Sequence, residues 1–238
     1  MIHASPPTIG IIGGFGPDTS AAFCARIVQH AHASKPEHSP AFVVDFVSVP
    51  PDIASKAIAG SRAAGKILVA AVNDSIRRLH TTGVRSIALP CNTLHLFADD
   101  FVLPSPLRLL HIVDAVLLEL KHHHVKRIGL LATGLTVSSG LYSCRCRRQE
   151  VQCFVPSVAL QRRLNKEITH FVSTGSVSDC CTTTFAAIFQ ECGNQEVSAV
   201  VLGCTDLGGM LERCGLACPL VCIDSMDVLA KACARHCV

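Results

Sequence analysis

The sequence predicts an α/β protein made of two similar lobes, each a mainly parallel sheet flanked by helices. Short apolar runs alternate with longer amphipathic runs along the 238 residues, as expected where crossover helices connect parallel strands. The run "TIGIIGG" from Thr8 resembles "RIGLLAT" from Arg127, 119 positions later. The Cys-bearing turn "LPCNTLH" resembles "VLGCTDL", with 113 positions between Cys91 and Cys204. The two offsets nearly agree, which favours a duplicated lobe.

The predicted strands are short, nearly continuous apolar runs, as strands covered on both faces should be. They span residues 8–13, 42–48, 85–90, 109–112, 127–132, 151–155, 197–202 and 220–223. The predicted helices span residues 17–32, 61–82, 113–123, 138–150, 159–174, 177–192 and 226–237. Pro17 suits the first turn of a helix that follows a glycine-rich run. The repeat divides the chain into one lobe of residues 1–108 plus 213–238 and a second lobe of residues 109–212.

Composition and charge exclude several classes of partner. The formal charge of +3 is too small to indicate nucleic acid, and the basic residues lack interleaved aromatic residues. No apolar run reaches the roughly 20 residues of a membrane helix. Residues 1–14 contain no basic stretch typical of a secretion signal. We therefore expect a cytoplasmic protein with no nucleic-acid partner and no membrane span.

The fourteen cysteines allow three interpretations. A disulfide framework is typical of small, loop-rich secreted domains, whereas this chain has long apolar elements. A structural zinc site is not expected, because the chain contains no C-x-x-C pair. Mostly free thiols in a reducing compartment are the favoured interpretation, and no metal is predicted.

The glycine-rich segment "GIIGGFGPDTS" lacks the signatures of nucleotide loops. Thr19 stands where the dinucleotide fingerprint has its third glycine, and no Gly-Lys-Ser/Thr follows as in a P-loop. A tight strand-to-helix turn with free backbone N–H groups remains, and it can hold a small carboxylate. A plain turn that uses glycine for steric reasons is an equally good interpretation.

Cys91 and Cys204 each follow an apolar strand and precede a predicted helix start. The helix dipole and exposed N–H groups stabilise a thiolate at such a position. Inert packing is the usual role of an isolated cysteine, but these two share a context that the other cysteines lack. Asn92, Thr93 and Thr205 stand beside the sulfurs, where they can bind substrate or cap helices.

Two thiols on opposite faces of one carbon suggest stereoinversion. One thiolate removes the α-proton, and the opposite thiol returns a proton to the other face. Ligands of open α/β sheets sit beyond the carboxyl ends of the strands, so facing lobes would share one cleft. An approach of about 3–3.5 Å on each side puts the sulfurs roughly 7–9 Å apart. Such chemistry needs no cofactor, and no lysine has a setting that suggests a pyridoxal site.

The motifs "GIIGGFGP", "PCNTLH", "GLLATGLTVSSGLY", "VPSVALQ" and "LGCTDL" resemble those of the aspartate/glutamate racemase family, and its aspartate racemase branch most closely. They fall in family order and cover most of the chain. The resemblance implies a pseudo-twofold pair of lobes with the active site between them, cofactor-independent racemisation of an amino acid, and a homodimer. It implies Cys91 and Cys204 as the catalytic pair. The substrate-binding positions that it implies are Asn92, Thr93, Thr133 and Thr205, and the glycine loop adds Gly14 and Phe15 as candidates.

Several positions depart from the family pattern. Ile53 stands where aspartate racemases typically carry an Arg suited to a side-chain carboxylate, and Lys56 is a nearby substitute. Phe15 replaces a common Met, and Asp206 replaces a common Glu that could tune Cys204. Two alternative functions stay open: a superfamily decarboxylase or isomerase, and an amino-acid-binding regulatory protein without turnover. Two intact cysteine motifs count against the decarboxylase, which resembles a one-cysteine arrangement.

Overall fold

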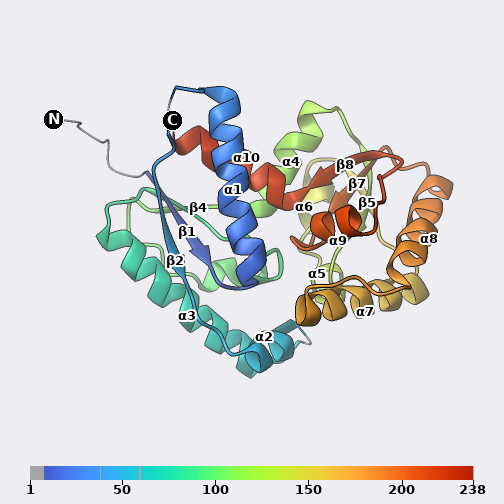
Figure 1. Ribbon diagram of the computed structural model, residues 1–238, viewed down its shortest axis with the longest axis horizontal. Helices are drawn as coiled ribbons and strands as arrows, with labels where there is room; N and C mark the ends of the chain where they lie inside the picture. Colours follow the sequence, from blue (N-terminus) through green and yellow to red (C-terminus); the bar gives the residue numbers. More distant parts are fainter. Residues whose placement is uncertain (1–7, 38, 59, 238) are drawn as a thin grey trace. The chain divides into compact units, whose positions relative to one another are not determined.

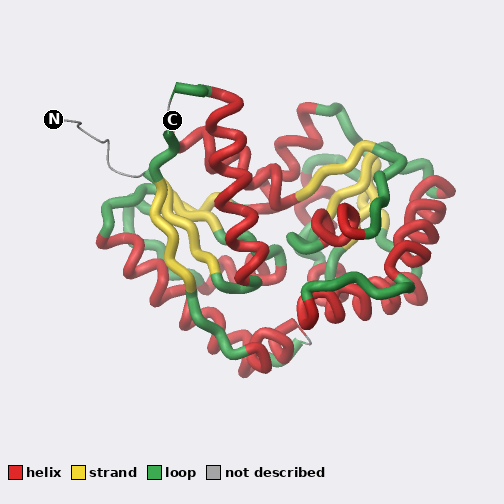
Figure 2. The backbone as a smooth tube through the Cα atoms, viewed as in Figure 1, coloured by secondary structure: helices red, strands yellow, loops and turns green. Residues whose placement is uncertain are grey.

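The chain forms two compact units, each built around its own parallel sheet (Figures 1 and 2). The computed structural model describes residues 8–37, 39–58 and 60–237. Unit 1 comprises Met1–Ala115 and Met226–Val238, and unit 2 comprises Val116–Ser225. Residues 1–7, which hold half of the segment inspected for a secretion signal, lie outside the described residues.

The two sheets have the same strand order, which confirms the predicted pair of similar α/β lobes. In unit 1 the order is β2-β1-β3-β4, and in unit 2 it is β6-β5-β7-β8, with every pair parallel. The strands of unit 1 are β1 (Ile9–Gly13), β2 (Phe42–Phe46), β3 (Ser86–Ala88) and β4 (Arg108–Leu110). Those of unit 2 are β5 (Arg127–Leu131), β6 (Gln152–Phe154), β7 (Ala199–Leu202) and β8 (Val221–Asp224).

Helices cover both faces of the first sheet. They are α1 (Pro17–Ser34), α2 (Pro51–Ile58), α3 (Arg62–Thr81), the 3₁₀ helix η1 (Thr93–Asp100) and most of α10 (Ser225–Cys237). Right-handed crossovers place α1 and α3 on opposite faces, because the chain crosses the sheet in opposite directions before and after β2. The buried residues Leu68, Val72 and Ile76 of α3 recur every four positions and pack into the apolar core beside the sheet.

Unit 2 repeats this plan with more helices. They are α4 (Ile112–His122), which begins in unit 1, α5 (Gly134–Ser138), α6 (Ser143–Arg148), α7 (Val158–Thr174), α8 (Cys181–Asn194) and α9 (Leu207–Arg213). Leu164 of α7, Phe185 of α8 and Met210 of α9 share one apolar core with Leu202 of β7. The core therefore fixes the helix that follows the second candidate cysteine.

The predicted lobe boundaries need two corrections. β4 was assigned to the second lobe, residues 109–212, but it pairs with β3 in the first sheet. The last strand was assigned to the first lobe, with residues 213–238, but β8 pairs with β7 in the second sheet. Both β4 and β8 are edge strands, and each joins the sheet formed by the strands that come before it in the chain. A division at the sequence repeat misses this, because the repeat marks where each sheet begins and not where it ends.

All eight predicted strands are present, and the long helices agree with the prediction to within a few residues at each end. The predicted helix 138–150 is instead α5, a turn and α6, and α2 was not predicted. For η1 and α9, only a helix start after each candidate cysteine was predicted, without bounds. These helices have eight residues or fewer. Elements this short show too little of the 3.6-residue period to be recognised in sequence.

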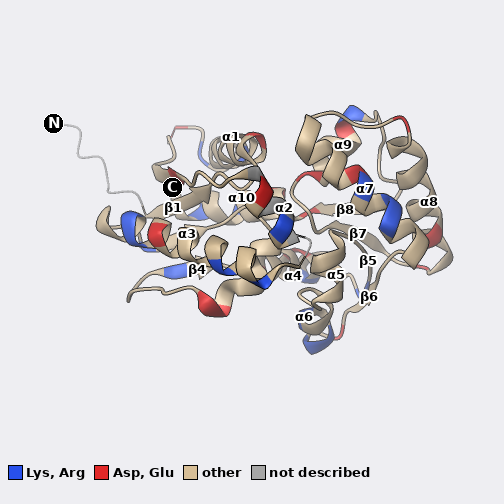
Figure 3. Cartoon of the chain, turned by 90° about the horizontal axis from the view of Figure 1, so that it is seen from below, with Lys and Arg blue, Asp and Glu red and all other residues tan. Residues whose placement is uncertain are grey.

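Charged residues lie mainly on the helices and turns, as the blue and red segments of Figure 3 show. The central strands β1, β3 and β7 contain none, and all of their residues are buried. Within the described residues, no helix combines the length and the apolar character that crossing a membrane requires.

Candidate functional site

In each unit, the candidate cysteine follows the strand that neighbours the first strand of the unit. Cys91 follows β3, which pairs with β1, and Cys204 follows β7, which pairs with β5. Ile11 pairs with Ala88 across β1 and β3, so Gly14 and Cys91 each lie three residues beyond a paired position. Leu131 pairs with Leu202 across β5 and β7. Thr133 and Cys204 each lie two residues further on, at the carboxyl ends of these two strands. Carboxyl ends of parallel strands are the usual place for ligands. The structure thus assembles two half-sites with the same plan, one in each unit.

Cys91 sits in a tight turn that is fixed by His95. The backbone N–H of Cys91 donates to the Leu89 carbonyl at 2.8 Å. His95 is 2% exposed, and its Nε2 accepts the backbone N–H of Ile112 at 3.2 Å. Its proton therefore lies on Nδ1, which donates to the Cys91 carbonyl at 3.1 Å. The ring of His111 packs edge-on against His95, with centroids 4.5 Å apart.

Asn92 and Thr93 follow the cysteine at the start of η1, where both are buried. The Asn92 carbonyl accepts the backbone N–H of His95 at 3.1 Å. The turn from Cys91 to His95 is thus tied by main-chain and side-chain hydrogen bonds together, while Cys91 itself remains partly exposed. This half-site holds a reachable thiol on a rigid backbone.

The glycine loop beside Cys91 is more closed than the sequence indicated. Gly14 adopts a φ of +98°, and a Cβ there would lie 2.1 Å from the Val47 carbonyl oxygen, so only glycine fits. Its N–H is not free, because it donates to Ser20 Oγ at 3.0 Å. Ser20 Oγ in turn donates to the Gly16 carbonyl at 2.8 Å. The expectation of free N–H groups is therefore corrected at Gly14, since a hydroxyl from the first turn of α1 satisfies that donor.

Two residues discussed for the substrate site share an apolar core with Cys91. Phe15, Ile53 and Cys91 all pack, partly buried, against the apolar core of unit 1. Lys56, the proposed substitute for a carboxylate-binding Arg, forms an ion pair with Asp52 at 2.9 Å on the exposed side of α2. That contact lowers the pKa of the Asp52 carboxyl through the hydrogen bond from Lys56. The position that the family resemblance reserves for a cation is thus apolar, and the nearest lysine is paired elsewhere.

Cys204 is buried, in contrast to Cys91, with 7% of its surface exposed. Its Sγ lies 3.7 Å from Asp206 Oδ2. The Cys204 carbonyl accepts the N–H of Leu207 at 3.1 Å, and the Asp206 carbonyl accepts that of Met210 at 3.0 Å, which starts α9. Thr205 between them is 6% exposed. A carboxylate at this distance from the sulfur can accept or return the thiol proton.

A tyrosine packs beneath the Cys204 turn. Tyr142 is fully buried, and burial raises the pKa of its phenol well above the ordinary value, so it stays neutral. It forms a hydrogen bond with Ser225, which is also buried. A Cβ on Gly203 would lie 3.2 Å from the Tyr142 ring and 2.8 Å from Leu130 Cδ1. A side chain at the residue before Cys204 would therefore displace Leu130 and press on the Tyr142 ring.

Thr133 lies on the β5 side of the same edge, where α7 fixes its turn. Thr133 Oγ1 accepts the Thr136 N–H at 3.2 Å and caps α5. Asn165 Oδ1 accepts the Gly134 N–H at 2.8 Å. Gln161 Nε2 donates to the Ala132 carbonyl and to Asn165 Oδ1, both at 2.9 Å. Two amide side chains from one face of α7 therefore hold the backbone on either side of Thr133.

Sequence reasoning did not single out His95, Tyr142, Gln161 and Asn165. His95 was present in the quoted motif "PCNTLH", four positions after Cys91, and the i to i+4 spacing of a helical turn could have indicated its contact. Tyr142 and Asn165 reach the half-site from distant segments, so no local pattern marks them. Across residues 8–37, 39–58 and 60–237, no three His, Cys, Asp or Glu side chains gather in a way that could hold a metal ion.

Comparison with known proteins identifies the family. The model of the Asp/Glu/hydantoin racemase family matches residues 12–233. The broad specificity amino-acid racemase RacX of Bacillus subtilis (strain 168) is 25% identical over 228 residues, covering 94% of this chain and 95% of that protein.

Solved structures agree in fold. The aspartate racemase of Picrophilus torridus matches with a TM-score of 0.77 at 25% identity, covering 96% of this chain and 93% of that one. An aspartate racemase homologue from Pyrococcus horikoshii OT3 has a TM-score of 0.72 at 21% identity, covering 97% and 98%. With the family model spanning nearly the whole sequence, the chain belongs to the Asp/Glu/hydantoin racemase family.

Proposed function

We propose that this protein is a cofactor-independent amino-acid racemase in which Cys91 and Cys204 are the two bases. The observation that carries the proposal is the repeated half-site: each sheet ends in one cysteine at the same place in the same strand order. A single-base enzyme has no use for the second copy. Family membership and the similarity to a broad specificity racemase support the same reaction class.

In the proposed reaction, the substrate Cα lies between the two sulfurs, which approach it from opposite faces. The thiolate on one side removes the α-proton, and the thiol on the other side donates its own proton to the opposite face of the carbanion. Atoms and charge balance, because one thiolate and one thiol exchange roles in each turnover. Well-placed hydrogen bonds to the carboxylate must stabilise the carbanion, since an amino-acid α-C–H is a very weak acid.

The two half-sites are suited to different parts of this task. The partly exposed Cys91 offers a reachable sulfur, with Asn92 and Thr93 beside it as hydrogen-bonding partners for the substrate carboxylate or ammonium group. The buried Cys204 has Asp206 as a proton partner, and Thr205 and Thr133 at the same sheet edge. We propose that the sulfurs lie roughly 7–9 Å apart in the working enzyme, the separation that a two-sided approach requires.

The proposed substrate class follows from the residue types at positions 15 and 53, which pack against the same apolar core as Cys91. A side-chain carboxylate that loses water needs a cation or several donors, whereas Ile53 and Phe15 supply neither. Lys56 is already paired with Asp52. We therefore propose that the enzyme accepts neutral amino acids at least as well as aspartate. The broad specificity named for the Bacillus subtilis relative is consistent with this proposal.

We also propose a cytoplasmic homodimer. Family resemblance supports the dimer, which light scattering after size-exclusion chromatography would test. All fourteen cysteines are free thiols in the structure, as suits a reducing compartment.

The direct test is a racemase assay on single L- and D-amino acids, with chiral chromatography as readout and no added cofactor. We expect interconversion of several neutral amino acids, and weaker turnover of aspartate. Binding of amino acids without inversion would instead favour the regulatory alternative. Loss of carbon dioxide from a malonate-type substrate would favour the decarboxylase.

A further inference from the structure

The turn at Thr133 is held by two amide side chains to which the proposed reaction assigns no role. Gln161 and Asn165 stand four positions apart on α7, and Gln161 Nε2 donates to Asn165 Oδ1 at 2.9 Å. Gln161 Nε2 also donates to the Ala132 carbonyl at 2.9 Å. The Gly134 N–H donates to Asn165 Oδ1 at 2.8 Å. These four groups form one continuous chain of hydrogen bonds that passes around Thr133.

This chain of hydrogen bonds fixes both peptide planes that flank Thr133. The Ala132 carbonyl belongs to the peptide unit before Thr133, and the Gly134 N–H belongs to the peptide unit after it. Because each peptide unit is planar, the φ of −62° and the ψ of 151° at Thr133 set how the two planes are oriented. Gln161 and Asn165 therefore determine the direction in which the Thr133 side chain leaves the backbone at the carboxyl end of β5.

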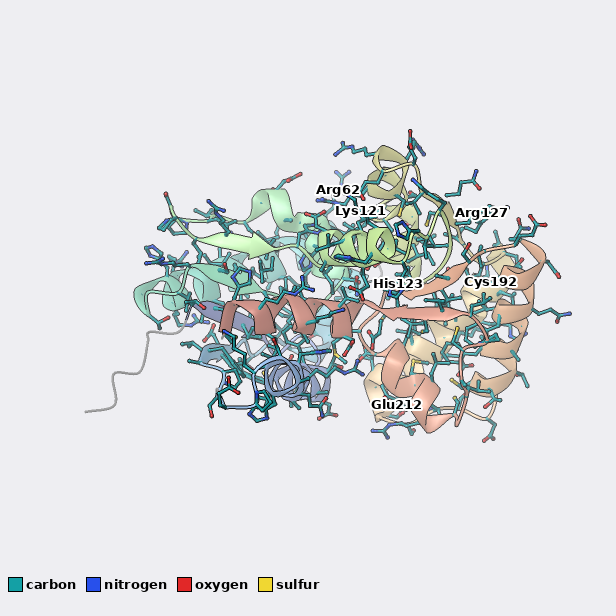
Figure 4. The ribbon with its side chains drawn as sticks, turned by 90° about the horizontal axis from the view of Figure 1, so that it is seen from above. Arg62, Lys121, His123, Arg127, Cys192 and Glu212 are labelled. Atoms are coloured by element: carbon teal, nitrogen blue, oxygen red, sulfur yellow. The ribbon has the colours of Figure 1, made fainter. Side chains whose placement is uncertain are left out.

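The helix that carries the two amides is itself anchored. Leu164 and Ile168 of α7 are buried in the apolar core of unit 2. Helix α7 packs against α8, and Cys192 of α8, labelled in Figure 4, belongs to the same core. At the other end of the contact, an added Cβ on Gly134 would lie 2.6 Å from Asn165 Nδ2. The amide thus reaches the backbone because glycine leaves room for it.

The two amides have opposite roles in the chain of hydrogen bonds. The Gly134 N–H can only donate, so it requires the oxygen of Asn165. The Ala132 carbonyl can only accept, so it requires the nitrogen of Gln161, whose second hydrogen then faces Asn165 Oδ1. Gln161 Oε1 has no hydrogen-bond partner among the residues that the structure describes. Asn165 therefore serves the turn as an acceptor, and Gln161 serves it as a donor.

We propose that Gln161 and Asn165 are positioning residues, which hold Thr133 and the Gly134 backbone in the geometry that receives the amino-acid substrate. The inference rests on the proposed racemase function, in which Thr133 binds substrate. Neither amide has to touch the substrate for this role. A misplaced binding group weakens contacts that must match the transition state closely, so loss of either amide lowers kcat more than it raises KM.

The test uses the opposite roles of the two amides. Asn165→Asp keeps an acceptor oxygen, whereas Asn165→Leu removes it. We expect kcat to fall on the order of tenfold to a hundredfold in Asn165→Leu, and Asn165→Asp to keep most of the wild-type rate. Gln161→Glu is an equally conservative change, but it replaces the donor with a carboxylate that faces two acceptor oxygens. It should therefore lose activity at neutral pH, as Asn165→Leu does.

The pH profile separates positioning from a general loss of structure. In Gln161→Glu, the two acceptor oxygens raise the pKa of the introduced carboxyl, and its protonated form can donate one hydrogen bond. The kcat of this variant, divided by that of wild type at the same pH, should rise as the pH falls from about 8 to about 5.5. If Asn165→Leu fails to fold, this ratio decides the matter, and a ratio independent of pH would count against the proposal.

Gln190→Leu is the matched control, because Gln190 is an exposed amide of α8, and it should keep the wild-type kcat and KM. Unchanged kcat in Asn165→Leu and Gln161→Glu would overturn the positioning role and leave the racemase proposal intact. An Asn165→Asp enzyme as slow as Asn165→Leu would also overturn it. A wild-type protein that inverts no amino acid would instead refute the proposed function, and the positioning role with it.

Discussion

The half-sites of the two units share a plan but differ in how they hold the cysteine. In unit 1, Cys91 is partly exposed, and His95 fixes its carbonyl through a neutral imidazole. In unit 2, Cys204 is buried, has a carboxylate 3.7 Å away and sits above Tyr142. The strand order is the same in both units. The shared strand order thus gives both cysteines the same place in their sheets, while the surrounding side chains give the two sulfurs different environments.

The largest expected effect comes from removing either sulfur. Cys91→Ser and Cys204→Ser should each lower racemisation at least roughly a hundredfold, because an acid/base group contributes on that order and serine is a much weaker acid. The measurement is kcat/KM in both directions, with Cys144→Ser as a control that keeps its rate. If one of the two variants racemises near the wild-type rate, the two-base comparison fails.

The support of Cys91 can be broken through His95. His95→Ala removes a partner from the Cys91 carbonyl and from the Ile112 N–H, and Ile112 is fully buried. Each buried group left without a partner costs about 1–3 kcal/mol. We expect a lower free energy of unfolding in urea and a lower kcat for every substrate alike.

His80→Ala is the control for the histidine variant, because His80 is an exposed histidine of α3. It should leave both quantities unchanged. A His95→Ala enzyme with wild-type stability and rate would show that the hydrogen bonds to the Cys91 turn are dispensable.

The support of Cys204 can be broken through Gly203. A methyl group there meets Leu130 at 2.8 Å and Tyr142 at 3.2 Å, so Gly203→Ala overpacks the turn. Overpacking costs roughly 1–3 kcal/mol. Gly209→Ala, in α9, meets only Phe171 at 3.8 Å and should be neutral or slightly stabilising. Thermal unfolding of the two variants distinguishes tight packing under Cys204 from a general intolerance of alanine, which equal destabilisation would indicate.

The smallest expected effect is on substrate choice, in the half-site of Cys91. Ile53→Arg should raise kcat/KM for aspartate relative to neutral amino acids if residue 53 faces the substrate, because it supplies the missing cation. Lys56→Ala should leave the preference unchanged, since Lys56 pairs with Asp52. Strong wild-type preference for aspartate that disappears in Lys56→Ala would show that the lysine binds the carboxylate.

Most of the fold was predictable because buried parallel strands appear in the sequence as continuous apolar runs, which can be recognised without knowledge of the tertiary structure. β1 and β7 are fully buried and were recognised almost to the residue. The strand that closes each sheet was assigned to the wrong lobe, because sequence repeats do not show which neighbour an edge strand selects.

Within the candidate half-sites, the cysteines and the polar residues next to them could be proposed from sequence, since they follow strands directly. The sequence could not identify Tyr142 or the Gln161–Asn165 pair, which reach their half-site through packing of segments distant in the chain. The sequence analysis also predicted a free N–H at Gly14. The hydroxyl that accepts it belongs to Ser20, in the first turn of the following helix, and no sequence pattern marks that contact.

The central claim is that each cysteine serves one face of the substrate, and proton exchange in D2O tests it most directly. Wild type incubated with a single enantiomer should place deuterium at Cα and produce the opposite enantiomer. Cys91→Ser and Cys204→Ser should produce no inversion, and each variant should exchange the α-proton of only one enantiomer, a different one in each. Exchange of the same enantiomer in both variants, or undiminished inversion in either, would contradict the account.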